Sequence, residues 1–280
     1  MSLWSQFGVK VCSRIEVEQT RIIRRRIITY LIHNFVKLPS VIFQIMAHQM
    51  IGGYKLSRGI AAGAYGRVFL GTKSTADKEE FAAIKQMFAP TGMNHVVESY
   101  EKEKSILKVC DHPNIVKLLH HEEQGDLLYL VLQYCNGESL RKYIETEKSV
   151  PFEIKLLFCH DACQGLMYLH SKKILHRDLK PDNLLIHQDP YGLSLILGDV
   201  GVGRYIPDGK TNEQATLTAN KGTEDWMAPE MYAETGKIKA HYNRESDVFA
   251  MGLCLAAILV HKEGEPLRPL EGTRVIIKHT

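Results

Sequence analysis

The alternation of apolar and polar residues predicts a strand-rich part followed by a helical part. From Tyr54 onward, glycines punctuate apolar stretches, which predicts strands, and the pattern recurs around Val116–Leu119 and over Leu127–Tyr134. Between them, residues from about Met93 to Cys110 carry apolar side chains at helical spacing. The first part is therefore expected to be a small sheet with one helix.

After Asn136-Gly137 the apolar spacing changes to a helical period. Pro151 stands where a helix begins, and an apolar side chain then recurs every three or four positions, at Ile154, Phe158, Ala162, Leu166 and Leu169. A second, mostly helical lobe is predicted from here. A strand-rich lobe followed by a helical one places the fold in the α+β class.

Residues 1–53 have a different character. A basic cluster between Arg21 and Arg26 precedes an apolar stretch, Ile27–Met46, that polar residues and Pro39 interrupt. Because a bilayer span needs roughly 20 apolar residues, this stretch is a poor candidate for one. A poorly ordered extension is expected. An interfacial helix with weak membrane contact, or an organelle-targeting segment, remains the alternative.

Composition places the chain among ordinary globular proteins, with 45% hydrophobic and 24% charged residues. Of the net charge of +3, residues 1–50 contribute +5 and residues 51–280 contribute −2, so no nucleic-acid binding is expected of the body. The six cysteines are scattered, without a Cys-x-x-Cys pair, which favours a reducing compartment. We therefore expect a cytoplasmic protein, with a nuclear location or N-terminal targeting left open.

One polar octet, His176–Asn183, lies between two short apolar runs and is predicted to form a loop. Transfer of a phosphoryl group to a hydroxyl needs a carboxylate that orients the hydroxyl and accepts its proton, a cation near the transferred group, and an oxygen ligand for a metal. Asp178, Lys180 and Asn183 supply these three groups within one turn. A solvated turn would explain the polarity of the octet but not the order of its residues.

The octet resembles the catalytic-loop signature of eukaryotic protein kinases, and Lys180 resembles the serine/threonine branch of that family. The resemblance covers about Tyr54 to Val260. It implies a bilobal protein kinase fold, with a β-rich N-lobe and one regulatory helix in residues 54–134 and a mainly helical C-lobe in residues 135–280. It also implies ATP and Mg²⁺ as cofactors and a protein serine or threonine as the substrate.

Other parts of the family pattern occur in the expected order. Ala61–Val68 resembles the glycine-rich loop that covers the ATP phosphates, with alanine in place of its first glycine. Phe81–Lys85 resembles the strand whose lysine contacts the α- and β-phosphates. Glu103 shares a helical face with Tyr100, so its carboxylate is expected to point inward and to pair with Lys85.

Further positions are implied by the resemblance. Leu128–Tyr134 resembles the strand leading into the hinge, where Leu132 is the gatekeeper and the backbone of Gln133 to Cys135 faces adenine. The nucleotide-binding positions are Ile60, Ala61, Gly63, Gly66, Val68, Ala83, Lys85, Glu103, Leu132, Gln133, Cys135, Leu185 and Asp199. Asp199, in Gly198–Gly201, resembles the metal-binding Asp-Phe-Gly aspartate and would hold Mg²⁺ together with Asn183.

Three other features carry expectations. Val200 replaces a larger phenylalanine, so the contact with the helix that carries Glu103 is expected to be looser. The threonine-rich segment after Asp199 matches the activation loop, where an upstream activating kinase would place a phosphate against Arg177. Asp182 resembles a substrate-facing acidic position, which predicts a preference for basic residues before the acceptor.

Two hypotheses about activity follow. Only 33 residues follow Asp247, which resembles the aspartate that braces the catalytic loop, so the C-lobe is expected to lack the family's last helices and an arginine partner for Glu230. The first hypothesis is an active serine/threonine kinase, since every polar residue that the reaction needs is present. The second is a pseudokinase-like regulatory or scaffolding module with weak or no phosphoryl transfer, motivated by Ala61, Val200 and the short C-lobe.

Overall fold

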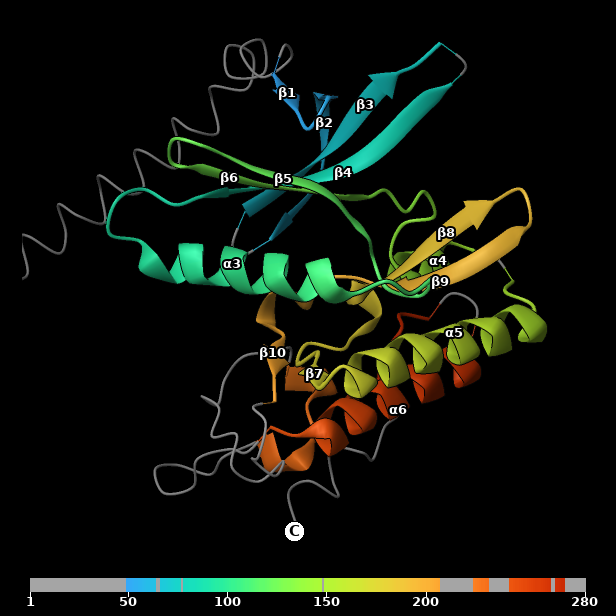
Figure 1. Ribbon diagram of the computed structural model, residues 1–280. Helices are drawn as coiled ribbons and strands as arrows, with labels where there is room; N and C mark the ends of the chain where they lie inside the picture. The colour runs from blue at the N-terminus through green and yellow to red at the C-terminus, as the bar shows by residue number, and fades with distance from the viewer. Residues whose placement is uncertain are drawn as a thin grey trace, which may run out of the picture. The chain divides into compact units, whose positions relative to one another are not determined.

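The N-terminal lobe is an antiparallel sheet, shown in blue to green in Figure 1. In the computed structural model its six strands follow the order β1-β2-β3-β4-β6-β5. Their bounds are β1 Met50–Ile51, β2 Tyr54–Gly63, β3 Gly66–Ser74, β4 Glu79–Phe88, β5 Leu118–Gln124 and β6 Leu127–Gln133. In β4 the fully buried Ala82 and Ile84 alternate with more exposed residues, as expected for a strand with one face on the core.

The structure describes residues 49–63, 66–76, 78–147, 149–206, 224–231, 242–262 and 265–269. The sheet begins at Met50, slightly before the lobe boundary predicted at Tyr54. Residues 1–48, which form most of the predicted extension, lie outside the described residues. Among the helices that are described, none has both the length and the apolar character needed to cross a bilayer.

Helix α3 (Asn94–Val109) packs against the sheet of this lobe, as Figure 1 shows. Its bounds agree with the helix predicted from about Met93 to Cys110. Tyr100, Glu103 and Leu107 are buried on one face of the helix. A buried carboxylate is costly without a cationic partner, so the placement of Glu103 requires one from a neighbouring element.

The C-terminal lobe is mainly helical. Its helices are α4 Leu140–Thr146, α5 Phe152–Ser171 and α6 Arg244–Val260, with single-turn 3-10 helices η1 Pro181–Asn183, η2 Val200–Val202, η4 Glu224–Trp226 and η5 Pro229–Met231. Two small ladders complete it, β8 Leu184–Asp189 with β9 Gly192–Leu197, and β7 Ile174–Leu175 with β10 Arg204–Tyr205. The whole is an α+β fold of two lobes.

The core of the second lobe lies where α5, α6 and the β8–β9 hairpin meet. Phe158, Ala162, Leu166 and Leu169 of α5 are buried there, which confirms the predicted helical face, while Ile154 is half-buried at its edge. Helix α6 begins with a capping box, in which the Asn243 side chain accepts the Ser246 amide at 2.9 Å. This cap fixes the start of the helix beneath the catalytic loop.

The predicted strand at Val116–Leu119 begins later than expected. The Val116 amide donates to the Leu197 carbonyl of β9 (2.9 Å), and Ile115 forms an isolated bridge with the same residue. These residues therefore join the two lobes, and the sheet pairing with β6 starts only at Leu118. Local spacing predicted the strand, but its start is determined by a partner 81 positions away.

Candidate active site

The loop that holds the candidate catalytic residues is bonded to a buried carboxylate at the start of α6. Asp247 accepts the amides of His176 (2.8 Å) and Arg177 (2.9 Å), one on each oxygen. His170 Nε2 lies 2.9 Å from it, and the Tyr242 hydroxyl also donates to it. Burial alone would raise the pKa of Asp247, but these hydrogen bonds and the nearby His176 together lower it. The ionised carboxylate thus holds the loop where Arg177 takes a left-handed conformation (φ 72°).

The three residues expected to carry the chemistry come together in this loop. Lys180 Nζ donates to Asp178 Oδ2 at 2.7 Å. Asn183 Nδ2 donates to the same oxygen at 2.9 Å and to the Asp178 carbonyl at 2.7 Å. The Asp178 side chain remains 14% exposed, so its carboxylate is oriented from within the loop and still reachable by a substrate.

A second group of charges joins the two lobes. The Lys85 ammonium on β4 lies 2.8 and 2.7 Å from the two oxygens of Glu103 on α3, and 3.0 Å from Oδ1 of Asp199. Burial alone would lower the pKa of Lys85, but the two carboxylates raise it well above its ordinary value. For Asp199, burial would raise the pKa, and Lys85, His176 and Lys180 together lower it. Burial and the nearby Asp199 raise the pKa of Glu103 against the lowering effect of Lys85. The shifts therefore support a charged Lys85 and a charged Asp199 at neutral pH.

The turn after Asp199 is packed tightly against α3. Asp199 takes a left-handed conformation (φ 47°), and Val200 is fully buried in the core with Leu107. A β-carbon at Gly201 would lie 2.8 Å from Glu103 Oε2, so only glycine fits without displacing that carboxylate. Glu103 remains paired with Lys85 although Val200 is smaller than the phenylalanine of the family pattern, and the expected looser contact stays a prediction.

The glycine-rich segment forms the β2–β3 hairpin. Ala61 pairs with Val68 and Gly63 with Gly66, while the residues at its tip, 64 and 65, lie outside the described residues. Ala61 is exposed and Ile60 is half-buried. A β-carbon at Gly66 would lie 2.0 Å from the Gln86 carbonyl, so a side chain at this position would separate β3 from β4.

The predicted hinge follows β6, where Leu132 pairs with Ala83 of β4. The Gln133 amide donates to the Lys117 carbonyl at 2.9 Å and is not available to a ligand. The backbones of Tyr134 and Cys135 make no hydrogen bond to the backbone of another described residue, so these two residues offer hinge groups to a ligand. Cys135 is half-buried. Burial raises the pKa of its thiol to about 12. Leu185 of β8 lies on the opposite lobe, next to Gly198.

This geometry agrees with what comparison of the sequence shows. Residues 54–273 match the protein kinase domain, which is most of the chain. The chain belongs to the eukaryotic protein kinase family, in its serine/threonine branch. The fold is accordingly the bilobal kinase fold, with α3 as the regulatory helix of the N-lobe.

Several curated kinases are similar to this kinase domain over part of their length. Serine/threonine-protein kinase pakG of Dictyostelium discoideum is 35% identical over 181 residues, which are 64% of this chain and 14% of that protein. Serine/threonine-protein kinase ATG1a of Arabidopsis thaliana is 31% identical over 214 residues, 76% of this chain and 32% of that protein. Dual specificity testis-specific protein kinase 2 of Mus musculus is 30% identical over 165 residues, 59% of this chain and 28% of that protein. The chain spans less than a third of each of these relatives.

The donor atoms of the kinase site suit a magnesium ion. Asn183 bonds Asp178 through its amide nitrogen, which leaves its side-chain oxygen as an acceptor, and Asp199 uses one oxygen on Lys85 and keeps the other. Mg²⁺ prefers oxygen ligands and is commonly bound by one or two carboxylates together with substrate phosphates. Asn183 and Asp199 offer oxygens of this kind, and among the described residues no group of three His, Cys, Asp or Glu side chains could hold a metal ion.

The start of the activation segment is paired with the catalytic loop region. Arg204 and Tyr205 of β10 pair with Leu175 and Ile174 of β7. The predicted phosphorylation sites at Thr211, Thr216, Thr218 and Thr223 and the side chain of Glu230 lie outside the described residues. Arg177 is 7% exposed, and its Nε and Nη2 bond to no other described residue.

Two groups of functional interest were not predicted from the sequence. His170 and Tyr242 bond Asp247 from positions 77 and 5 residues away, and neither stands in a recognisable motif. Arg141 of α4 bonds Asp182, beside the catalytic Asn183. In the sequence, the only sign that Arg141 forms ion pairs was its i, i+4 spacing from Glu145 on the same helix. Asp182 was expected to face a basic substrate residue, but its carboxylate is already paired.

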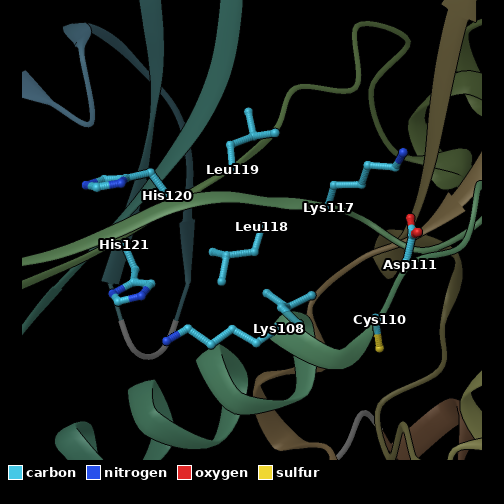
Figure 2. Close-up of a pocket in the computed structure, with 9 residues that line it drawn as sticks. Lys108, Cys110, Asp111, Lys117, Leu118, Leu119, His120 and His121 are labelled. Carbon is cyan, nitrogen blue, oxygen red and sulfur yellow. The ribbon is translucent and has the colours of Figure 1, made fainter.

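A separate cavity of about 440 Å³ lies at the carboxyl end of α3, where that helix faces β5 (Figure 2). Its lining residues are Leu107, Lys108, Cys110, Asp111, Lys117, Leu118, Leu119, His120 and His121. In Figure 2, both imidazoles and the Lys108 ammonium lie toward one end, and Lys117 and Asp111 toward the other. Burial and the positive charge of Lys108 lower the pKa of His121. No residue assigned to phosphoryl transfer lines this cavity.

Proposed function

We propose that the chain is an active serine/threonine protein kinase that transfers the γ-phosphate of Mg-ATP to hydroxyls of proteins. The observation that carries the proposal is the closed arrangement of Lys85 between Glu103 and Asp199, at 2.7 and 3.0 Å. This arrangement requires α3 to lie against the sheet and Asp199 to face the other lobe. Both placements are needed for phosphoryl transfer in protein kinases.

The residues then have separate tasks. The Lys85 ammonium, held by Glu103, offers positive charge to the nucleotide phosphates, since pairing with Glu103 and Asp199 outweighs burial and keeps it protonated. Asp178 orients the acceptor hydroxyl and takes its proton, while Lys180, 2.7 Å from that carboxylate, places positive charge near the transferred group. Asn183 and Asp199 would hold Mg²⁺, which when bound neutralises charge on the phosphates.

A pseudokinase-like module is the second candidate, and Ala61 is the observation that favours it. Its β-carbon replaces a glycine where backbone amides approach phosphates. The side chain is exposed in the β2–β3 hairpin and does not prevent the hairpin from pairing. Val200, the other departure, is buried and leaves Glu103 paired. The active kinase is therefore better supported.

We also propose that phosphorylation of the threonine-rich segment by an upstream kinase stabilises the active arrangement. Support comes from Arg177, a buried guanidinium whose Nε and Nη2 bond to no other described residue. Burial and the nearby Arg204 lower the pKa of Arg177, although Tyr242 and Asp247 act in the opposite direction, and an anion placed there would stabilise the charged guanidinium. A phosphate supplies the charge and the acceptor oxygens for this role.

We further propose a cytoplasmic protein whose partners are proteins rather than nucleic acids. The five described cysteines form no disulfide with one another, as is usual in a reducing compartment. Residues 51–280 carry a net charge of −2, which does not suit a phosphate backbone. Fractionation of cells that express the tagged chain would test the location.

The activity is tested by transfer of radiolabelled phosphate from Mg-ATP to a generic protein substrate, alongside thermal shift with Mg-ATP. The wild type is expected to do both. Lys85→Met and Asp199→Asn are expected to abolish transfer while the circular dichroism spectrum remains that of the wild type. A wild type that binds Mg-ATP but transfers no phosphate, even after treatment with an activating kinase, would establish the pseudokinase instead.

A further inference from the structure

An arginine of α4, Arg141, forms an ion pair with the carboxylate of Asp182, the residue before the candidate catalytic Asn183. Arg141 Nε is 3.0 Å from Oδ1 and 2.9 Å from Oδ2 of Asp182. Asp182 belongs to η1, immediately before Asn183, and its side chain is 44% exposed. A carboxylate in this position would be open to a ligand if Arg141 were not bonded to it.

Contacts from other parts of the lobe hold Arg141 in place. Its Nη1 donates to the Leu267 carbonyl at 2.6 Å and lies 3.6 Å from Glu145, and its guanidinium carbon is 5.9 Å from the centre of the Trp226 ring. Glu145 in turn accepts the Leu267 amide at 2.8 Å. An isolated exposed ion pair is weak, but a pair supported from several sides keeps its geometry. Arg141 therefore cannot leave Asp182 without losing several contacts at once.

Asp182 directly precedes a residue that bonds Asp178, which orients the acceptor hydroxyl in the proposed function. The residue after it, Asn183, bonds Asp178 Oδ2 at 2.9 Å. An extended peptide advances roughly 3.3 Å per residue, so residues two or three positions from a hydroxyl at Asp178 lie about 7–10 Å away from it. An arginine or lysine at these positions has a long enough side chain to reach the carboxylate of Asp182.

We propose that Arg141 is a specificity-determining residue, which prevents Asp182 from recognising basic side chains near the acceptor. The proposal rests on the kinase activity proposed above and specifies its substrate class, namely serine or threonine peptides without arginine or lysine beside the acceptor. A paired carboxylate offers little attraction to a second cation, whereas an unpaired one would select for it. The proposal reverses the preference for basic residues that Asp182 alone predicts.

The same helix shows a second pair of this kind. Lys142 Nζ donates to Glu138 at 2.5 Å, four residues earlier. Lys142 does not contact Asp182, although it is adjacent to Arg141 and carries the same charge. It therefore provides a matched control, because its removal changes the net charge of α4 by the same amount without exposing Asp182.

The experiment measures the affinity of two fluorescein-labelled serine peptides, one with two arginines before the serine and one with two alanines, by fluorescence anisotropy. Arg141→Ala is expected to bind the arginine peptide roughly twofold to fivefold more tightly than the wild type does, as expected for one new exposed charge pair. Its affinity for the alanine peptide should not change. The gain should vanish in Arg141→Ala/Asp182→Asn and be absent in Lys142→Ala.

Several results would overturn the proposal: no gain for Arg141→Ala, a gain that persists in the double variant, or an equal gain for Lys142→Ala. If Arg141→Ala does not fold, Asp182→Asn in the otherwise wild-type chain decides the question. It should leave the affinity for the arginine peptide unchanged, and a fall would show that Asp182 is already accessible. Binding is measured without phosphate transfer. A failure of the kinase activity would therefore be seen separately, as absence of radiolabelled phosphate on both peptides in the transfer assay.

Discussion

Replacement of Asp247 by asparagine should uncouple the catalytic loop from α6 with little change in side-chain volume. The aspartate has no exposed surface and accepts hydrogen bonds from four donors. These are the amides of His176 and Arg177, His170 Nε2 and the Tyr242 hydroxyl. In Asp247→Asn one of the two oxygens becomes an NH₂ group. Two of the four donors then face another donor and lose their acceptor.

The size of the effect follows from this count. A buried donor without a partner costs roughly 1–3 kcal/mol, so the loss of two acceptors should lower the free energy of unfolding by about 2–6 kcal/mol. Domains are stabilised by roughly 5–15 kcal/mol in total, so the variant should fold but be much less stable. Since 1 kcal/mol shifts Tm by about 2–4 °C for a domain of this size, the melting temperature should fall by roughly 10 °C.

Urea unfolding and thermal melting measure the stability change, and phosphate transfer measures the catalytic change. We expect kcat to fall at least tenfold, since the amides of His176 and Arg177 no longer hold the loop. Asp161→Asn is the matched control, because Asp161 is also buried and accepts the Leu195 amide of β9 at 2.9 Å rather than amides of the catalytic loop. It should lower Tm by less and leave kcat unchanged.

The pH dependence of the stability difference between the wild type and Asp247→Asn gives a further check. Because the pKa of Asp247 is lowered in the folded state, its carboxylate contributes fully to stability above the unfolded value of about 3.9, and this contribution is lost as the pH falls through the lower folded pKa. The difference in unfolding free energy between wild type and Asp247→Asn should therefore be constant from pH 6 to 8 and shrink below about pH 4. A variant within 1 kcal/mol of the wild type, with unchanged kcat, would refute the reasoning.

Three other predictions can be tested with single substitutions or a reagent. Asp178→Asn should lower kcat by about 10²–10⁴ with little change in the thermal shift produced by Mg-ATP, and a loss below tenfold would exclude it as the base. Gly201→Ala should weaken ATP binding, because the added carbon would lie 2.8 Å from Glu103 Oε2, whereas Gly252→Ala on the open face of α6 should leave binding unchanged and stabilise the helix by roughly 0.5–1 kcal/mol. Cys135, whose pKa is raised to about 12 by burial, should be alkylated by iodoacetamide at pH 7.5 more slowly than free cysteine, and equal rates would contradict its burial.

The sequence by itself determined the elements and the chemistry of the site. Helical spacing predicted α3 within one residue at each end and four buried positions of α5, because burial of one face imposes a period of 3.6 residues. The position of Glu103 on the buried face of α3 required a cation, and Lys85 provides it. Asp178, Lys180 and Asn183 lie within one turn, so their proximity follows from covalent geometry and a short loop.

Only the tertiary structure decided which distant groups complete these local patterns. Asp199 reaches Lys85 across 114 positions, Asp247 takes donors from two residues outside any motif, and Arg141 neutralises Asp182 across 41 positions. In the hinge, the Gln133 amide bonds Lys117, whereas the backbones of Tyr134 and Cys135 bond no other described backbone. Local periodicity reflects which face of an element is buried. It holds no information about which polar group of another element lies against that face, and in this kinase domain those pairings orient the catalytic loop and the side chains next to it.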